Sequence, residues 1–258
     1  MSSAPETQDQ PKPLVEHLTE LRDKLLRSLL AVIIVFIALF PFANEIYAFV
    51  SEPLRSILPE GASMIATDVA SPFLTPFKLT MVAALFLAIP YVLYQVWSFI
   101  APGMYRHEKR LAIPMMVSSI ALFYAGAAFA YFVVFPLIFA FFTSVGPTDV
   151  TIMTDINRYL DFVLKLFFAF GLAFEIPIAV ILSVWAGITT PDSLVSKRPY
   201  IIVGCFVVAM LLTPPDIISQ ALLALPMWAL FELGVFFGRL IERKKSREER
   251  SESKELSE

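Results

Sequence analysis

Residues 111–135 read LAIPMMVSSIALFYAGAAFAYFVVF, a stretch without one charged side chain. The hydrocarbon core of a bilayer is about 30 Å thick, and a helix needs about 20 apolar residues to cross it. This stretch is therefore long enough to form one transmembrane helix. It is one of six apolar runs along the chain, which lie at residues 25–43, 77–100, 111–135, 159–185, 200–212 and 217–237.

The composition of the whole chain also indicates a membrane protein. Hydrophobic residues make up 57% of it and charged residues only 17%, with a mean hydropathy of +0.72. So few polar side chains cannot cover a water-soluble globule, and much of the surface must face lipid. The single cysteine, Cys205, excludes an intrachain disulfide and a cysteine-based metal site. Nucleotide-binding loops, nucleophile elbows and zinc-binding helix motifs are absent, so we expect no enzyme, cofactor or nucleic-acid partner.

The last two apolar runs differ from the first four. The fifth reaches only about 20 Å at about 1.5 Å per residue before Thr213-Pro214-Pro215-Asp216 interrupts it. We therefore expect short fifth and sixth helices, with the shortfall met by bilayer thinning or by partner helices. Prolines within the runs tend to bend helices, which favours a cupped bundle. They are Pro90, Pro114, Pro136, Pro177 and Pro226.

The basic residues indicate the orientation. Of the 20 lysines and arginines, 16 lie in the N-terminal residues up to Arg27, in the loops after the second and fourth runs, or in the C-terminal tail. The other four are Arg55, Lys78, Arg158 and Lys165. The positive-inside rule therefore places both termini in the cytoplasm. We expect an all-α integral membrane protein with six transmembrane helices over residues 14–237. Residues 1–13 form a cytoplasmic tail, and the charged residues 238–258 read as a disordered cytoplasmic tail.

Three polar positions stand out against this apolar background. Glu175 lies at membrane depth, where a carboxylate is costly unless it faces the bundle interior, water or a partner. A protonated side chain bonded to a neighbouring helix would explain Glu175 equally well. On the cytoplasmic side, Glu20 lies on a leucine-striped segment that we expect to form a separate helix along the membrane surface. Glu20 and Glu108 could also serve only to balance nearby bases.

Four segments of the chain together resemble the TatC family, the multispanning subunit of the twin-arginine protein translocase. The resemblance covers residues 14–237 and keeps the order and spacing of the motifs. The segments are HLTELR at 17–22, MIATDVASPF at 64–73, FIAPGMYRHE at 99–108 and LLTPPD at 211–216.

The resemblance implies a receptor for signal peptides with two consecutive arginines. With TatA and TatB, such a receptor exports folded proteins across the bacterial cytoplasmic (inner) membrane by using the proton-motive force. Guanidinium groups bind carboxylates bidentately, so Glu20 and Glu108 would hold the two arginines. Phe99 would pack beside the apolar residue that follows the arginines, and Arg22 would help to shape the site.

The resemblance also implies sites within the membrane. Met210, Thr213 and Gln220 match positions where TatB and TatA helices dock, and Glu175 matches a polar residue on the concave side. Pro53 and Asp216 match motif positions with either a structural or a functional role. We further expect contact with membrane lipid and several copies of the chain in a hetero-oligomeric complex.

Two other functions are compatible with parts of the sequence. A secondary transporter with a membrane-embedded acidic site would explain Glu175 and the interrupted helices, but it predicts paired half-repeats, which the sequence lacks. A purely structural assembly factor would not need an acidic cytoplasmic surface, so neutral substitutions of Glu20 and Glu108 would then be harmless.

Overall fold

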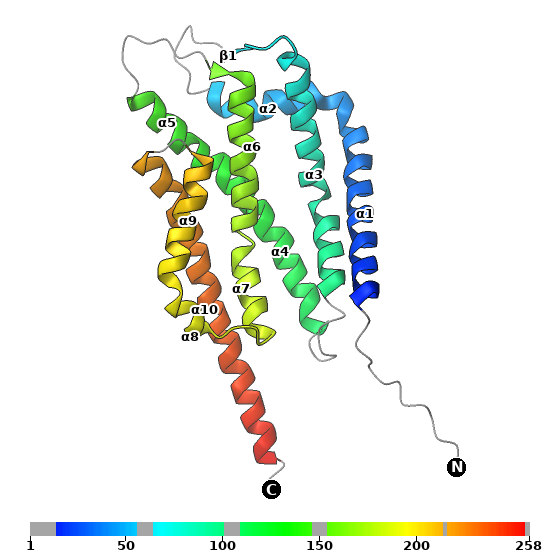
Figure 1. The fold of residues 1–258 in the computed structure, drawn as a ribbon, viewed down its shortest axis with the longest axis vertical. Coiled ribbons are helices and arrows are strands. Elements are labelled where there is room, and N and C mark those ends of the chain that lie inside the picture. Colours follow the sequence, from blue (N-terminus) through cyan, green and yellow to red (C-terminus); the bar gives the residue numbers. More distant parts are fainter. Residues whose placement is uncertain (1–13, 56–63, 101–108, 146–153, 214–215, 256–258) are drawn as a thin grey trace, which may run out of the picture.

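The computed structural model describes residues 14–55, 64–100, 109–145, 154–213 and 216–255, and almost all of them are helical (Figure 1). The two strands have two residues each and pair in parallel, with Met64 opposite Thr154. The elements are α1 (Leu14–Leu39), η1 (Phe40–Phe42), α2 (Ala43–Arg55), β1 (Met64–Ile65), α3 (Ser71–Ile100), α4 (Lys109–Phe129), η3 (Ala130–Val134), α5 (Phe135–Val145), β2 (Thr154–Asp155), α6 (Ile156–Ala173), α7 (Ile176–Trp185), α8 (Pro191–Ser196), α9 (Arg198–Leu212) and α10 (Ile217–Glu255).

The predicted all-α membrane fold is confirmed. Five apolar helical stretches are long enough to cross a membrane, and α9 is a sixth, shorter one. The short fifth span was predicted because Pro214 and Pro215 follow Thr213 in the sequence. The five long stretches are Leu18–Glu52, Ser71–Ile100, Ala112–Phe141, Ile156–Trp185 and Ile217–Arg243.

The prediction of a short sixth helix is wrong, and so is the expected disorder directly after it. α10 continues as one helix from Ile217 through Glu255, and its apolar part alone is long enough to span. The physical reason lies in the residues after Phe237, which are mostly arginine, lysine and glutamate. These straight-chain residues have high helix propensity, so a charged run can extend an existing helix.

One other local prediction is also corrected. The leucine-striped segment is not a separate surface helix, because α1 runs unbroken from Leu14 to Leu39. Pro53 lies within α2, and Pro76 lies within α3. Pro72 lies in the first turn of α3, where a missing backbone N–H costs nothing.

The helices define two ends of the molecule. At one, which we call the inner end, α1 begins, α3 ends, α4 begins and α10 ends (Figure 1). At the other, the outer end, α2, the two strands and the start of α6 meet. The first and last described helices therefore have their free ends on the same side, in agreement with the distribution of basic residues.

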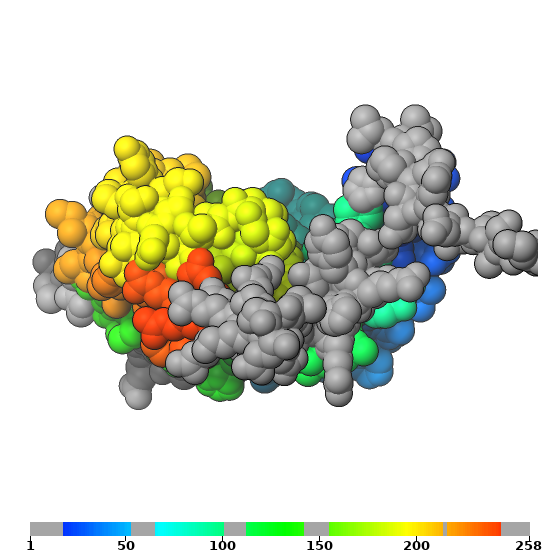
Figure 2. All heavy atoms as spheres, turned by 90° about the horizontal axis from the view of Figure 1, so that it is seen from below, coloured from blue at the N-terminus to red at the C-terminus, as the bar shows by residue number. Residues whose placement is uncertain are grey.

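The helices form a row in which α6 is central. α1 packs on α3 at one edge, and α9 packs on α10 at the other. Seen from the inner end, the α8–α9 region and α1 lie on opposite sides of the molecule (Figure 2). The largest buried apolar cluster includes Leu160, Val163 and Phe170 of α6.

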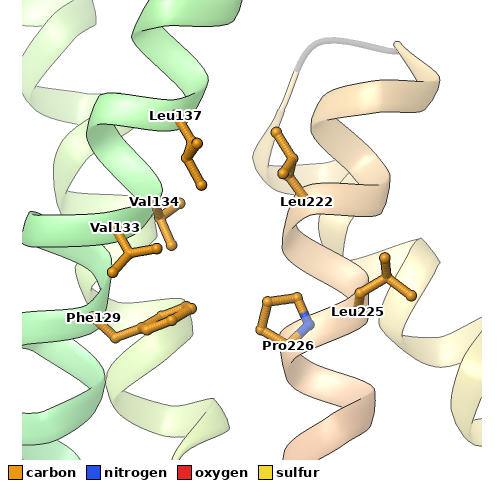
Figure 3. A pocket seen from close by; sticks show the side chains of 7 residues that line it. All are labelled: Phe129, Val133, Val134, Leu137, Leu222, Leu225 and Pro226. Atoms are coloured by element: carbon orange, nitrogen blue, oxygen red, sulfur yellow. The ribbon is translucent and has the colours of Figure 1, made fainter.

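An apolar groove of about 190 Å³ separates the arm formed by α4, η3 and α5 from α10. In Figure 3, Phe129 and Leu137 point across it toward Leu222 and Pro226. The π-helical segment η3 directly precedes α5, whose second residue is Pro136. Proline cannot donate the regular backbone hydrogen bond, and a wider turn accommodates that loss. The groove has no polar lining residue and supplies no chemistry.

Candidate functional site

The inner ends of α1 and α3 bring together three of the four predicted signal-peptide residues. Glu20 and Arg22 lie in the second and third turns of α1, and Phe99 is the penultimate residue of α3. Glu20 and Phe99 are both partly buried, whereas Arg22 is exposed. The fourth predicted residue, Glu108, lies outside the described residues.

A hydrogen bond between Lys24 of α1 and Ser98 of α3 joins these two helices. Lys24 Nζ donates to Ser98 Oγ at 2.6 Å, and Ser98 Oγ donates to the Gln95 carbonyl oxygen at 2.9 Å. Arg22 pairs with the adjacent Asp23, with its Nη2 atom 2.9 Å from Asp23 Oδ1. The turn of α1 that follows Glu20 is therefore joined to the turn of α3 that contains Phe99. The result is a surface with a carboxylate, basic groups and an aromatic ring from two helices.

Glu175 lies within the membrane span, at the break between α6 and α7. Pro177 accounts for the break because it has no backbone N–H to donate. Ser119 Oγ of α4 donates a hydrogen bond to Glu175 Oε2. Glu175 Oε1 is buried and has no hydrogen-bond partner in the part of the chain that the structure describes. One carboxylate oxygen thus remains available to a further donor.

The contact between Ser119 and Glu175 follows from a close crossing of α4 and α6. A Cβ atom added at Gly126 would lie 2.5 Å from the Phe170 carbonyl oxygen. One added at Gly171 would lie 2.8 Å from a ring carbon of Phe123. Small residues allow helix backbones to approach closely in membranes. Sequence reasoning did not find Ser119, although the cost of an unpaired intramembrane carboxylate was a signal to search for a facing hydroxyl.

The three predicted docking residues surround the junction of α9 and α10. Met210 is 50% exposed, and Gln220 is partly buried near the start of α10. Thr213 is only 7% exposed, and its hydroxyl donates to the Ala209 carbonyl oxygen at 2.9 Å. Met210 is thus the most accessible of the three, whereas the Thr213 hydroxyl is engaged within its own chain.

Asp216 and Pro53 were predicted to have either a structural or a functional role. Asp216 Oδ1 accepts a hydrogen bond from the Ser219 backbone N–H at 2.7 Å, in the manner of an N-cap for α10. Its other oxygen is buried and unpartnered among the described residues. The cap gives Asp216 a structural role. Pro53 lies in the last turn of α2, two residues before the helix ends at Arg55.

The outer end contains a hydrogen-bonded set that sequence reasoning missed. Asp155 caps α6 by accepting from the backbone N–H groups of Asn157 and Arg158, each at 3.0 Å. Its other oxygen accepts from the Thr67 hydroxyl at 2.5 Å and backbone N–H at 3.1 Å. The Thr67 hydroxyl, followed by these backbone donors, lowers the pKa of Asp155 to about 2.

Asn157 extends this set into the bundle. Its side-chain oxygen accepts a hydrogen bond from the Thr75 hydroxyl, and its amide nitrogen donates to Ser71 Oγ. Ser71 and Thr75 are both buried. The ends of α3 and α6 are therefore joined at the outer end. Because these partners are more than 80 residues apart in sequence, no local pattern indicates the pairing.

Comparisons with known proteins agree with this arrangement. A family model described as "Sec-independent protein translocase protein (TatC)" matches residues 16–226. The Sec-independent protein translocase protein TatC of Azotobacter chroococcum is 65% identical over 244 residues, 95% of each chain. That of Escherichia coli K12 is 57% identical over 239 residues, which cover 92% of this chain and 93% of the relative.

A solved structure has the same fold. It is described as the crystal structure of the twin arginine translocase receptor TatC, and it is 39% identical in sequence with a TM-score of 0.79. The match covers 87% of this chain and 98% of the solved one. The chain therefore belongs to the TatC family and is a multipass membrane component of the Sec-independent protein translocase.

Proposed function

We propose that the chain is the receptor for twin-arginine signal peptides. Working with TatA and TatB, it exports folded proteins across the bacterial cytoplasmic membrane by using the proton-motive force. The observation that supports this most directly is the hydrogen bond that joins the inner ends of α1 and α3, because Glu20 lies one turn before Lys24 and Phe99 directly follows Ser98. The similar solved protein is described as a twin arginine translocase receptor.

The chemistry of this surface suits a pair of guanidinium groups. An arginine side chain presents parallel N–H donors that match the two oxygens of a carboxylate, whereas lysine is a point charge. In the proposal, Glu20 holds one arginine and Glu108, in the neighbouring motif, holds the other. The ring of Phe99 packs against the apolar residue that follows the arginines, and Arg22 helps to shape the site.

Cross-linking of a twin-arginine signal peptide to membranes that contain the full chain tests this assignment. We expect E20A and E108A each to reduce cross-linking about tenfold or more, since a charge-assisted hydrogen bond contributes about 1.5–3 kcal/mol. A twin-lysine peptide should lose binding similarly. E242A is the matched control, because Glu242 is an exposed carboxylate on α10. Unchanged cross-linking in E20A and E108A would overturn the site assignment.

The membrane part of the proposal assigns the junction of α9 and α10 to partner helices. Met210, Thr213 and Gln220 form the proposed docking surface. α9 has only 15 residues and is shorter than the bilayer is thick, so a partner helix can cover the remaining depth. M210A should reduce cross-linking to TatB in membranes. Glu175, with one oxygen that has no hydrogen-bond partner among the described residues, is assigned a contact with a signal peptide or a partner's polar residue. Normal export by both E175Q and E175A would remove Glu175 from the proposal.

A further inference from the structure

An ion pair joins the first residue of α9 to α10. Arg198 Nη2 donates to Glu232 Oε2 at 2.5 Å, and the two side chains are 40% and 27% exposed. Arg198 Nε and Glu232 Oε1 are buried and have no hydrogen-bond partner among the described residues. The pair is thus partly withdrawn from water. Loss of either partner would leave a poorly solvated charge.

The charge at the start of α9 makes this ion pair important for the helix. The free N–H groups at a helix N-terminus carry partial positive charge, which disfavours a cation and favours a carboxylate. Arg198 is a cation at this position, and the preceding Lys197 makes no side-chain cap bond. The Glu232 carboxylate therefore offsets both the guanidinium charge and the positive helix end.

Few side chains of α9 are fully buried. Only Cys205 and Ala209 are buried among its 15 residues, and its main packing partner is α10. A helix held by so few buried side chains can shift along or away from its neighbour more easily than a central helix. The proposed docking surface combines Met210 of α9 with Gln220 of α10, so its shape depends on the register between these helices.

We propose that Arg198 and Glu232 are positioning residues that set the register of α9 against α10 and thereby shape the surface that accepts partner helices. This inference rests on the proposed docking function of that surface. Arg198 is about 18 Å along the helix from Met210 at 1.5 Å per residue. The pair therefore acts through the position of α9, without touching a partner that binds at Met210.

The test measures the distance between the two helices in the full chain, reconstituted in lipid bilayers. Spin labels are placed at the exposed positions 208 and 218, in a C205A background common to all variants. Electron paramagnetic resonance then gives the distance distribution for R198Q and E232Q. We expect both variants to broaden or shift it. We also expect both to reduce cross-linking of the chain to TatB about tenfold, as is common for coupled contacts.

A second ion pair provides matched controls. Arg239 of α10 pairs with Asp192 of α8 at 3.4 Å, and the Asp192 side chain is 91% exposed. R239Q and D192N should leave the distance distribution and the cross-linking unchanged, because exposed pairs contribute little. The exchanged variant R198E/E232R should restore the narrow distribution.

Three results would overturn the inference. The first is a distance distribution that stays unchanged in R198Q and E232Q. The second is an equal change in the control variants R239Q and D192N. The third is a failure of R198E/E232R to restore the narrow distribution. Failure of the docking proposal would be seen differently. If M210A keeps full cross-linking, the docking surface is wrong, whereas the distances still report on the ion pair. If M210A loses cross-linking but R198Q and E232Q keep both readouts, docking stands and the positioning role falls.

Discussion

Helices α6 and α9 are both apolar membrane helices, but the chain holds them in opposite ways. Eight of the 18 residues of α6 are buried, against two of the 15 residues of α9. α6 packs against α3 and α4 in the centre of the row, whereas α9 lies at an edge against α10. Their ends differ too. Asp155 caps α6 through two backbone N–H groups, and α9 begins without a side-chain cap.

The difference separates the framework of the fold, around α6, from the proposed docking surface at α9. A central helix with many buried side chains and a cap opens only with the whole fold, whereas an edge helix with few buried side chains can move at low cost. Glu175 follows the end of α6, so its position is set by the framework. Met210 is on α9, and its side chain is 50% exposed in the proposed docking surface.

Glycine substitutions provide the largest expected contrast between the two helices. In G126A the new Cβ would lie 2.5 Å from a backbone oxygen of α6, which cannot move as a side chain can. We expect G126A to reduce the free energy of unfolding by about 3 kcal/mol, as overpacking does. G204A is the matched control on α9, because no atom of the described residues lies within 4 Å of its Cβ position.

Denaturation of the purified chain in detergent measures both glycine variants. G204A should be unchanged or slightly more stable, since alanine has the higher helix propensity. Equal stability of G126A and wild type would mean that α4 and α6 can separate freely, and the framework role of α6 would then be wrong.

Removal of the Asn157 side chain should have the next largest effect. N157A takes one hydrogen-bond partner from each of the buried hydroxyls of Ser71 and Thr75. A buried polar group without a partner costs about 1–3 kcal/mol, so we expect a loss of about 2 kcal/mol in the free energy of unfolding. N44A, at an exposed asparagine of the outer end, is the control. A loss no greater than that of N44A would contradict the assigned hydrogen bonds.

Much of the framework could be predicted from the sequence, because lipid imposes a simple rule. Backbone groups in the membrane must be bonded within a helix, so each long apolar run indicates one span. The short α9 was also predictable, since Pro214 and Pro215 end the preceding run. The length of α10 was not, because a run of charges is compatible both with disorder and with the extension of a helix that packing has already begun.

The contacts of the candidate sites were less predictable than their residues. Glu175 was found from its membrane depth, but Ser119 lies 56 positions away in the sequence and is one of two adjacent serines. Arg198 and Glu232 likewise lie 34 positions apart. Such pairs depend on how helices cross, and a pattern within one helix carries no information on that.

The cap of α6 gives the smallest expected effect, seen only in acid. The pKa of Asp155 is lowered from 3.8 to about 2 because the charged form accepts bonds from Thr67 and from backbone N–H groups. A lowered folded-state pKa means that the contribution to stability is complete above about pH 4 and is lost as the pH falls toward 2.

D155N cannot titrate but keeps an acceptor for the cap. The thermal midpoint of wild type should therefore fall more steeply between pH 4 and pH 2 than that of D155N. D192N, at an exposed aspartate, should follow wild type. Parallel curves for wild type and D155N would show that Asp155 contributes no charge-dependent capping. The end of α6 would then be held no more firmly by its cap than the uncapped start of α9.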